Sequence, residues 1–237
     1  MPVLAERAHP DDPGFQGTIY ERRMHERYRF ASAYADGKDV LDIACGTGWG
    51  WPDLGNPRSV TGIDVSSEAL REGRRLGFIQ RAAAAEMERL PFPSASFDVI
   101  TCLEAIEHIP ARAASAFLSE CCRVLRPGGI LVLSTPLRHD GRHSGNPWHC
   151  VEYSEQEIRG LLAPCFGELA ARIDGEDSPP VFLFAGSLLP GPAPEARPAW
   201  SGTEHHSRAA SWLESAATPS GFCFTPGGQE TVTASSM

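Results

Sequence analysis

A short apolar run that leads directly into a glycine-rich turn constrains the fold of this chain more than any other feature. Residues 40–44 have the composition of a buried parallel strand, and Gly46 and Gly48 follow at once. Glycines at such a place allow positive φ angles and a close approach of the backbone to a ligand, because no Cβ intervenes. A second apolar run, residues 60–65, is followed by Ser66, a residue typical of helix N-caps. This order predicts a parallel α/β sheet whose ligand binds at the carboxyl ends of the strands.

The alternation of strands and helices continues beyond these two runs. Apolar residues three or four positions apart predict helices over residues 18–34, 113–125 and 155–162. Apolar runs predict strands over residues 97–102 and 130–135, with weaker strands near 167–173 and 181–186. Residues 82–85 are four alanines, which favour a helix by propensity, but their context predicts a strand. The sequence Pro127-Gly128-Gly129 is expected to stop the helix that precedes it.

Composition divides the chain into one domain and two flanking segments. Residues 1–17 contain prolines and acidic residues without periodicity, which predicts an irregular leader. Residues 18–189 carry the alternating pattern and are expected to form the α/β domain. Residues 190–237 are rich in Pro, Gly, Ser and Thr, which predicts a low-complexity tail that is mostly disordered.

Charge and hydropathy exclude several classes of partner. The chain has 21 basic and 30 acidic residues, and its formal charge of −9 disfavours binding to nucleic acid. No apolar run approaches the roughly 18 residues that a membrane span needs. The 7 cysteines are odd in number and lack C-x-x-C spacing, so neither a disulfide framework nor a structural zinc site is indicated. We expect a soluble, cytoplasmic protein, and the sequence does not fix its oligomeric state.

The turn itself argues against two common nucleotide-binding motifs and resembles a third. A dinucleotide fingerprint needs a third glycine where this chain has Trp51, and no G-K-[ST] sequence follows. Residues 40–48, Val-Leu-Asp-Ile-Ala-Cys-Gly-Thr-Gly, resemble the first motif of the class I S-adenosylmethionine-dependent methyltransferases, in particular small-molecule enzymes of bacterial type. Later segments agree in order, and the resemblance covers residues 40–135 and extends more loosely to Phe184.

The resemblance implies a Rossmann-like, seven-stranded and mostly parallel sheet with helices on both faces, and S-adenosyl-L-methionine as the cofactor. Asp42 would attract the ammonium end of the cofactor, while backbone N–H groups at Gly46 and Gly48 face it. Asp64 would accept the ribose hydroxyl protons, although an Asp at this place can also simply cap the next helix. The implied cofactor-binding residues are Asp42, Ala44, Cys45, Gly46, Gly48, Asp64, Val65, Glu86, Met87 and Leu103. Glu86 and Met87 would hold the adenine; alternatively, Glu86 is a solvated surface residue.

A Glu-x-x-Glu-His segment follows the predicted strand at residues 97–102. If it is helical, Glu104 and His108 share a face, and so do Glu104 and Glu107. His108 is the candidate general base, since an imidazole exchanges a proton near neutral pH, and Glu104 is the second candidate catalytic residue.

The same segment also resembles the metal ligands of polyprenyl-phenol O-methyltransferases and of small-RNA 2′-O-methyltransferases. A fourth ligand would come from His143 or His149. A divalent metal is therefore an open alternative to which the sequence does not commit, and a purely structural role in packing is another.

The sequence is thus interpreted as an enzyme that transfers a methyl group from S-adenosyl-L-methionine to a small-molecule acceptor. An oxygen acceptor is favoured over a nitrogen acceptor. One alternative is an RNA 2′-O-methyltransferase, against which the acidic composition counts. Another is a non-catalytic protein that binds S-adenosylmethionine, because binding and turnover are separable.

Overall fold

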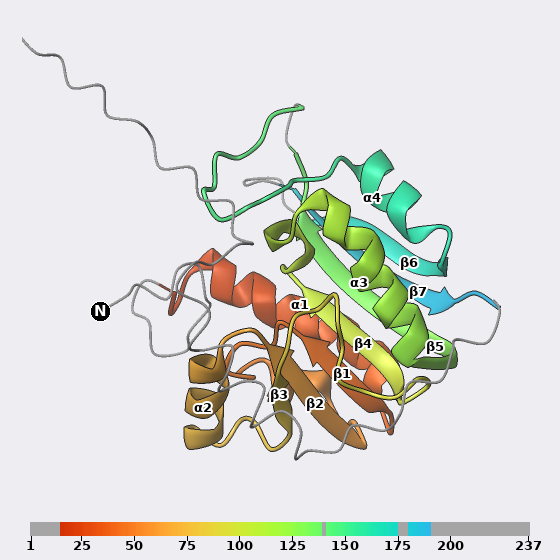
Figure 1. The fold of residues 1–237 in the computed structure, drawn as a ribbon. Helices are drawn as coiled ribbons and strands as arrows, with labels where there is room; N and C mark the ends of the chain where they lie inside the picture. The colour runs from red at the N-terminus through yellow and green to blue at the C-terminus, as the bar shows by residue number, and fades with distance from the viewer. Residues whose placement is uncertain (1–14, 139–140, 175–179, 191–237) are drawn as a thin grey trace, which may run out of the picture.

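The structure is a computed structural model that describes residues 15–138, 141–174 and 180–190. Most of the predicted leader and nearly all of the predicted low-complexity tail lie outside these residues. The described chain forms one seven-stranded sheet in the order β3-β2-β1-β4-β5-β7-β6 (Figure 1). Its strands are β1 (Asp39–Ile43), β2 (Ser59–Asp64), β3 (Ala82–Ala84), β4 (Phe97–Leu103), β5 (Leu125–Pro136), β6 (Phe166–Asp174) and β7 (Val181–Leu188).

The sheet is mostly parallel, as the sequence predicts. Strands β1 to β5 pair in parallel, and β7 runs antiparallel to both of its neighbours, β5 and β6. The order reverses at β1, which lies between β2 and β4. In an open α/β sheet such a reversal leaves a crevice at the carboxyl ends of the strands, where ligands bind. The fold therefore places the turn after β1 where a ligand is expected.

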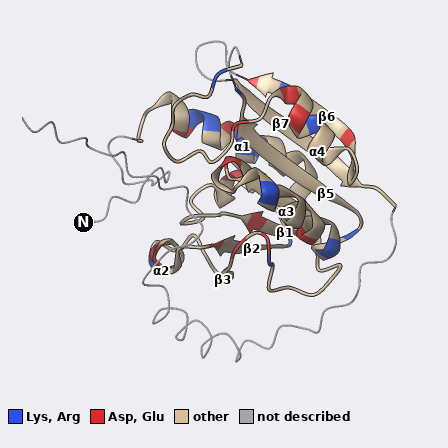
Figure 2. Ribbon diagram, turned by 45° about the horizontal axis from the view of Figure 1, so that its top comes forward, with Lys and Arg blue, Asp and Glu red and all other residues tan. Residues whose placement is uncertain are grey.

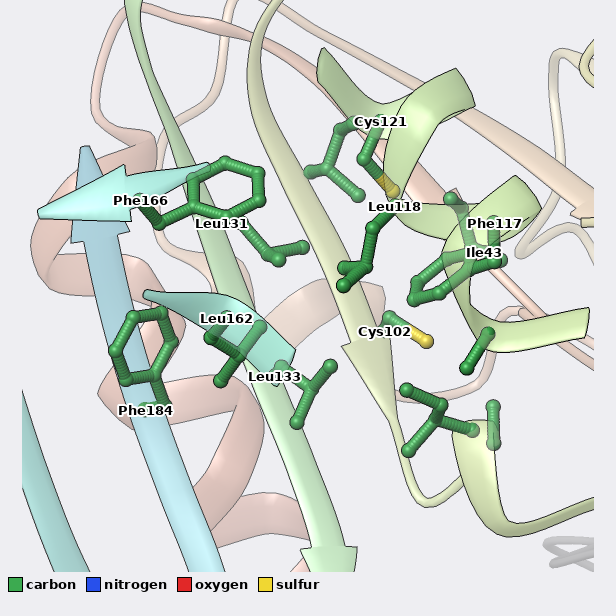
Figure 3. Close-up of a cluster of buried hydrophobic side chains, with 14 of the residues drawn as sticks. Ile43, Cys102, Phe117, Leu118, Cys121, Leu131, Leu133, Leu162, Phe166 and Phe184 are labelled. Carbon is green, nitrogen blue, oxygen red and sulfur yellow. The ribbon is translucent and has the colours of Figure 1, made fainter. Parts of the chain in front are cut away.

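Helices cover both faces of the sheet. They are α1 (Ile19–Ala35), α2 (Ser67–Arg75), α3 (Ala111–Val124) and α4 (Glu155–Leu162), with short 3₁₀ helices η1 (Trp51–Leu54) and η2 (Ile106–His108). On one face α3 packs on the sheet, and Figure 3 shows Phe117, Leu118 and Cys121 beside the strand residues Ile43 and Leu131. On the other face α1 and η1 bury a second apolar cluster against β1, β4 and β5. Side chains of Thr18, Ser66 and Ser154 cap the N-termini of α1, α2 and α4. None of the helices in the described part of the chain is long and apolar enough to span a bilayer.

Two connections in the sheet depart from a plain strand-to-helix alternation. The turn after β1 does not enter an α-helix: only the four-residue helix η1 lies between β1 and β2. Gly55 and Pro57, directly after η1, prevent a longer helix there. The helix predicted over residues 113–125 ends at Val124, ahead of Pro127-Gly128-Gly129, and these three residues lie within β5. They form an irregularity in the β4–β5 pairing, where Phe97 pairs with Leu125 and Val99 with Ile130.

Candidate active site

The turn after β1 has a backbone that requires small residues. Ala44, Gly46 and Gly48 all have positive φ, at 58°, 56° and 73°. Ala44 is exposed, and a non-glycine residue in this region is strained, which is common at functional sites. A Cβ at Gly48 would lie 2.7 Å from Cγ1 of Ile79, so glycine is required there for space as well as for conformation.

Asp64 connects the turn to the end of β2. Its side chain is buried, and its two carboxylate oxygens accept hydrogen bonds from the backbone N–H of Gly46 at 2.9 Å and of Ser66 at 2.8 Å. Val65, the next residue, is 56% exposed. Asp64 thus orders both the glycine turn and the start of α2, and an exposed apolar side chain flanks it.

Asp42 is a buried carboxylate near the end of β1, and it is 1% exposed. One oxygen accepts from Thr101 Oγ1 at 2.6 Å, and the other accepts from Tyr28 Oη at 3.0 Å and from Trp51 Nε1 at 2.7 Å. Burial raises the pKa of Asp42 to about 6, although the three hydrogen bonds lower it and the charge of Asp64 adds to the rise. The negative charge of Asp42 is therefore stabilised by three neutral hydrogen-bond donors in a buried site.

The remaining predicted cofactor residues lie along the same edge of the sheet. Cys45 is buried, and its backbone N–H donates to the carbonyl of Ile63 at 2.9 Å. Leu103 is the buried last residue of β4. Glu86 is exposed shortly after β3, and Met87 packs partly against the core. Because β3, β2, β1 and β4 are neighbours in this order, their carboxyl ends form one continuous edge. Figure 2 shows acidic residues on the adjacent strands β1 and β2, and basic residues along α1.

Glu104 follows β4 in a left-handed conformation, with a φ of 51°. Its carboxylate accepts from Ser134 Oγ at 2.7 Å and lies 3.3 Å from the guanidinium of Arg27, a residue of α1 that is itself buried. The helix considered for this segment does not form, because only residues 106–108 are helical and Ile109 is extended before Pro110. Glu104 and His108 therefore do not share a helical face.

The other two residues of the segment meet a distant loop. Ligand atoms of Glu107, His108 and His149 all lie within 4.8 Å of one another, so these three residues, without Glu104, have the geometry to hold a divalent ion. Glu107 is buried, and burial together with the charge of Glu104 raises its pKa. It accepts from Thr135 Oγ1 at 3.0 Å. His143, the other proposed fourth ligand, is exposed and has Nδ1 3.9 Å from a carboxylate oxygen of Glu152.

Hydrogen bonds orient both imidazoles. Nδ1 of His108 lies 3.0 Å from the backbone carbonyl oxygen of Trp148. Since a carbonyl only accepts, Nδ1 carries the proton and Nε2 of neutral His108 carries the lone pair. Nδ1 of His149 lies 2.7 Å from a carboxylate oxygen of Glu152, and its Nε2 lies 3.0 Å from the amide nitrogen of Asn146. Both nitrogens of His149 thus have partners within the protein.

Comparisons with known proteins agree with this geometry. Residues 41–133 match the family model of a methyltransferase domain. A probable S-adenosylmethionine-dependent methyltransferase of Mycolicibacterium smegmatis is 34% identical over 192 residues, which cover 78% of this chain and 70% of that protein. The chain belongs to the S-adenosylmethionine-dependent methyltransferases. S-adenosyl-L-methionine is therefore the cofactor of this methyltransferase.

Two further relatives define how far the likeness goes. A ubiquinone biosynthesis O-methyltransferase of Burkholderia vietnamiensis is 38% identical over 112 residues, which cover 44% of the chain and 46% of that protein. The methyltransferase thus spans about half the length of that relative. The N-methyltransferase NodS of Bradyrhizobium japonicum, solved with S-adenosyl-L-homocysteine, has a TM-score of 0.65 at 18% identity over 77% of this chain and 94% of that one. This likeness shows the Rossmann-like fold alone.

Sequence reasoning did not find several contacts within the candidate site. Tyr28 and Thr101 donate to Asp42, and Glu152 holds His149. Trp51 entered the sequence argument only as a residue that does not fit a dinucleotide turn, whereas its indole is a hydrogen-bond donor within the site. A buried aromatic residue near a glycine turn gives no local sequence signal of the carboxylate that it contacts, so only the fold reveals these partners.

Proposed function

We propose that this methyltransferase transfers the methyl group of S-adenosyl-L-methionine to a hydroxyl oxygen of a small-molecule acceptor, with His108 as general base. The observation that carries the proposal is the hydrogen bond from His108 Nδ1 to the carbonyl of Trp148, because it leaves Nε2 free to accept a proton. Glu104, which begins the same connection from β4 to α3, is proposed as a second residue at the reaction centre.

The proposed reaction is an in-line displacement at the methyl carbon. The acceptor oxygen forms the new bond as the bond from carbon to the sulfonium sulfur breaks, and the hydroxyl proton passes to Nε2 of His108. The products are the methyl ether, S-adenosyl-L-homocysteine and a protonated imidazole. Holding the two reacting atoms aligned and about 3–3.5 Å apart supplies up to ~7–11 kcal/mol in favourable systems. A base adds typically about 10²–10⁴-fold.

The cofactor would lie across the carboxyl ends of β1 and β2. We propose that Asp64 binds the ribose hydroxyls and that Asp42 attracts the ammonium group, directly or through water. Both carboxylates flank the positive-φ turn, whose Gly46 N–H already donates to an anion, the Asp64 carboxylate. Glu86 and Met87, after the neighbouring strand β3, are proposed at the adenine. The other proposed contacts are Ala44, Cys45, Gly48, Val65 and Leu103.

Features of the acceptor side favour a small molecule and an oxygen nucleophile. Trp148 is 43% exposed beside His108, which offers a flat apolar surface to an acceptor. The similarity to ubiquinone biosynthesis O-methyltransferases supports oxygen as the acceptor atom. The net charge of −9 opposes an RNA substrate. A nitrogen acceptor is the second choice.

A turnover assay on an acceptor panel tests the proposal. Release of S-adenosyl-L-homocysteine is measured with small phenols, catechols, amines and a short RNA, and product mass identifies the methylated atom. We expect turnover with a hydroxyl compound and none with RNA. His108→Ala should lower kcat by about 10²–10⁴-fold while the affinity for S-adenosyl-L-homocysteine stays unchanged.

The matched control is His25→Gln, which alters a histidine of α1 that pairs with Asp53 instead. It should keep its kcat. Unchanged turnover in His108→Ala would remove His108 from the mechanism, and turnover restricted to amines would overturn the oxygen assignment.

A further inference from the structure

Asp42 is surrounded by neutral hydrogen-bond donors. The donors are a phenol from α1, an indole from η1 and a hydroxyl from β4, namely Tyr28, Trp51 and Thr101. A carboxylate that is 1% exposed and held by neutral donors keeps an uncompensated negative charge. A cationic ligand group at this edge of the sheet would supply the missing countercharge.

Glycines fix the positions of the two aromatic donors. A Cβ at Gly50 would lie 2.1 Å from Cε2 of Tyr28, so the phenol ring occupies the space that a side chain at 50 would take. A Cβ at Gly62, on β2, would lie 2.9 Å from Cζ2 of Trp51. Both rings are therefore locked against backbone, and their polar atoms are directed at the same oxygen of Asp42.

We propose that Tyr28 and Trp51 are positioning residues for cofactor binding, which hold the Asp42 carboxylate in place as the charged acceptor for the ammonium end of the cofactor. The inference rests on the proposed assignment of Asp42 to that ammonium group. It adds that α1, through Tyr28, takes part in cofactor recognition without touching the cofactor.

The electrostatic surroundings of Asp42 give the inference a pH signature. The titratable groups that face it are Tyr28 on α1, Cys45 in the turn, Asp64 on β2 and Cys102 on β4. Burial raises the pKa of Asp42 to about 6, and hydrogen bonds from Thr101, Trp51 and Tyr28 oppose that rise. Loss of one donor should raise the pKa by roughly one more unit, since a hydrogen bond to a charged group is worth about that much.

The test is calorimetric titration with S-adenosyl-L-homocysteine between about pH 5.5 and 8.5. In the unaltered enzyme the affinity should fall as the pH drops through about 6, because Asp42 becomes protonated. In Tyr28→Phe, which keeps the ring against Gly50, the midpoint should move up by roughly one pH unit. Its affinity should then be roughly fivefold weaker near pH 6 and equal to that of the unaltered enzyme near pH 8.5. Thr101→Val, an isosteric loss of the β4 donor, should shift the midpoint in the same direction.

Two controls separate positioning from a general structural effect. Tyr34→Phe removes a hydroxyl from the same helix, where the ring packs beside Phe30, and should leave the profile unchanged. The ligand 5′-methylthioadenosine lacks the amino-acid end of the cofactor, so its binding should show no step near pH 6 in any variant.

The outcomes distinguish this inference from the proposed function. An affinity loss in Tyr28→Phe that is equal at every pH, or the same pH step with 5′-methylthioadenosine, would overturn the positioning role. A flat profile for the unaltered enzyme would overturn both the charge on Asp42 as a binding determinant and its assignment to the ammonium. The oxygen acceptor and the His108 base would remain, because they are tested by turnover.

Discussion

Trp51 and Trp148 lie on two halves of the same sheet edge, and the protein uses them in opposite ways. Trp51 is buried and its indole N–H donates to Asp42, so it is part of the framework around the proposed cofactor site. Trp148 has an exposed ring, and only its backbone is tied down, by the amide oxygen of Asn146 and by His108. We call the strand ends around Asp42, Asp64 and Thr101 the cofactor half, and His108 with the loop of residues 144–152 the acceptor half. The cofactor half is part of the strands, whereas the acceptor half is formed mainly by an irregular loop. If the proposed site is correct, cofactor binding depends on the strands of the fold and the choice of acceptor on one loop.

Replacement of Asp64 should reduce cofactor affinity more than any other change in the cofactor half. Asp64→Ala should weaken the binding of S-adenosyl-L-homocysteine by about 10²–10⁴-fold, because the two proposed ribose hydrogen bonds to this charged group are worth about 1.5–3 kcal/mol each. The Gly46 and Ser66 N–H groups would also lose their acceptor. Isothermal titration gives the affinity, with Asp36→Ala, an exposed residue after α1, as the control. A loss of less than about fivefold would show that Asp64 only caps α2.

The cofactor half was also the half that the sequence predicted. Its signals are local: two apolar runs, a glycine turn between them and an acidic residue at the end of the second run all fall within residues 40–65. Strand pairing then aligns Asp42 beside Gly62 and Thr101 without further information. Ala82–Ala84 became a strand against its helical propensity because it pairs with the end of β2.

The contacts of the acceptor half could not be predicted from the sequence because they join residues that are far apart along the chain. His108 meets Trp148, which lies 40 residues away along the chain in an irregular segment beyond α3 and β5. A helix through the Glu-x-x-Glu-His segment would have brought Glu104 and His108 to one face. Instead, Pro110 restricts Ile109 to an extended conformation, and the backbone N–H of Glu104 donates to Ser134. In the structure, a carboxylate oxygen of Glu107 therefore lies within 4.8 Å of ring nitrogens of His108 and His149, and Glu104 is not part of this group.

The buried charge of Asp42 should lower the stability of the cofactor half at neutral pH. Its pKa of about 6 lies above the unfolded value, so the folded state binds the extra proton and the stabilisation is lost as the pH rises from about 4 to about 6. Relative to Asp42→Asn, the unaltered protein should lose about 2 kcal/mol of unfolding free energy over that interval. Urea unfolding at a series of pH values measures the difference. Parallel curves for the two proteins would contradict the raised pKa.

A change in the acceptor half should have a smaller effect and spare the cofactor. Burial opposes the charge of Glu152, but hydrogen bonds from Ser144 and His149 keep its pKa below the usual value. Glu152→Gln removes the charge that anchors the 144–149 loop and should lower kcat/KM for the acceptor by about tenfold. The affinity for S-adenosyl-L-homocysteine should not change. Glu155→Gln, on the surface of α4, is the control, and an equal loss of cofactor affinity would show that the two halves are not independent.

Removal of metal ions should have the smallest effect, although Glu107, His108 and His149 have the spacing to hold one. Both ring nitrogens of His149 already have protein partners, Glu152 and Asn146, and Glu107 accepts a hydrogen bond from Thr135. Because these polar atoms are satisfied within the protein, an ion would have to displace the Asn146 amide from Nε2 before it could bind. Turnover after dialysis against a chelator should therefore stay within about twofold of the untreated value, a change of less than about 0.5 kcal/mol in the barrier. A larger loss that one divalent cation restores would mean that the acceptor half rearranges around a metal, and His108 would then act as a ligand instead of a base.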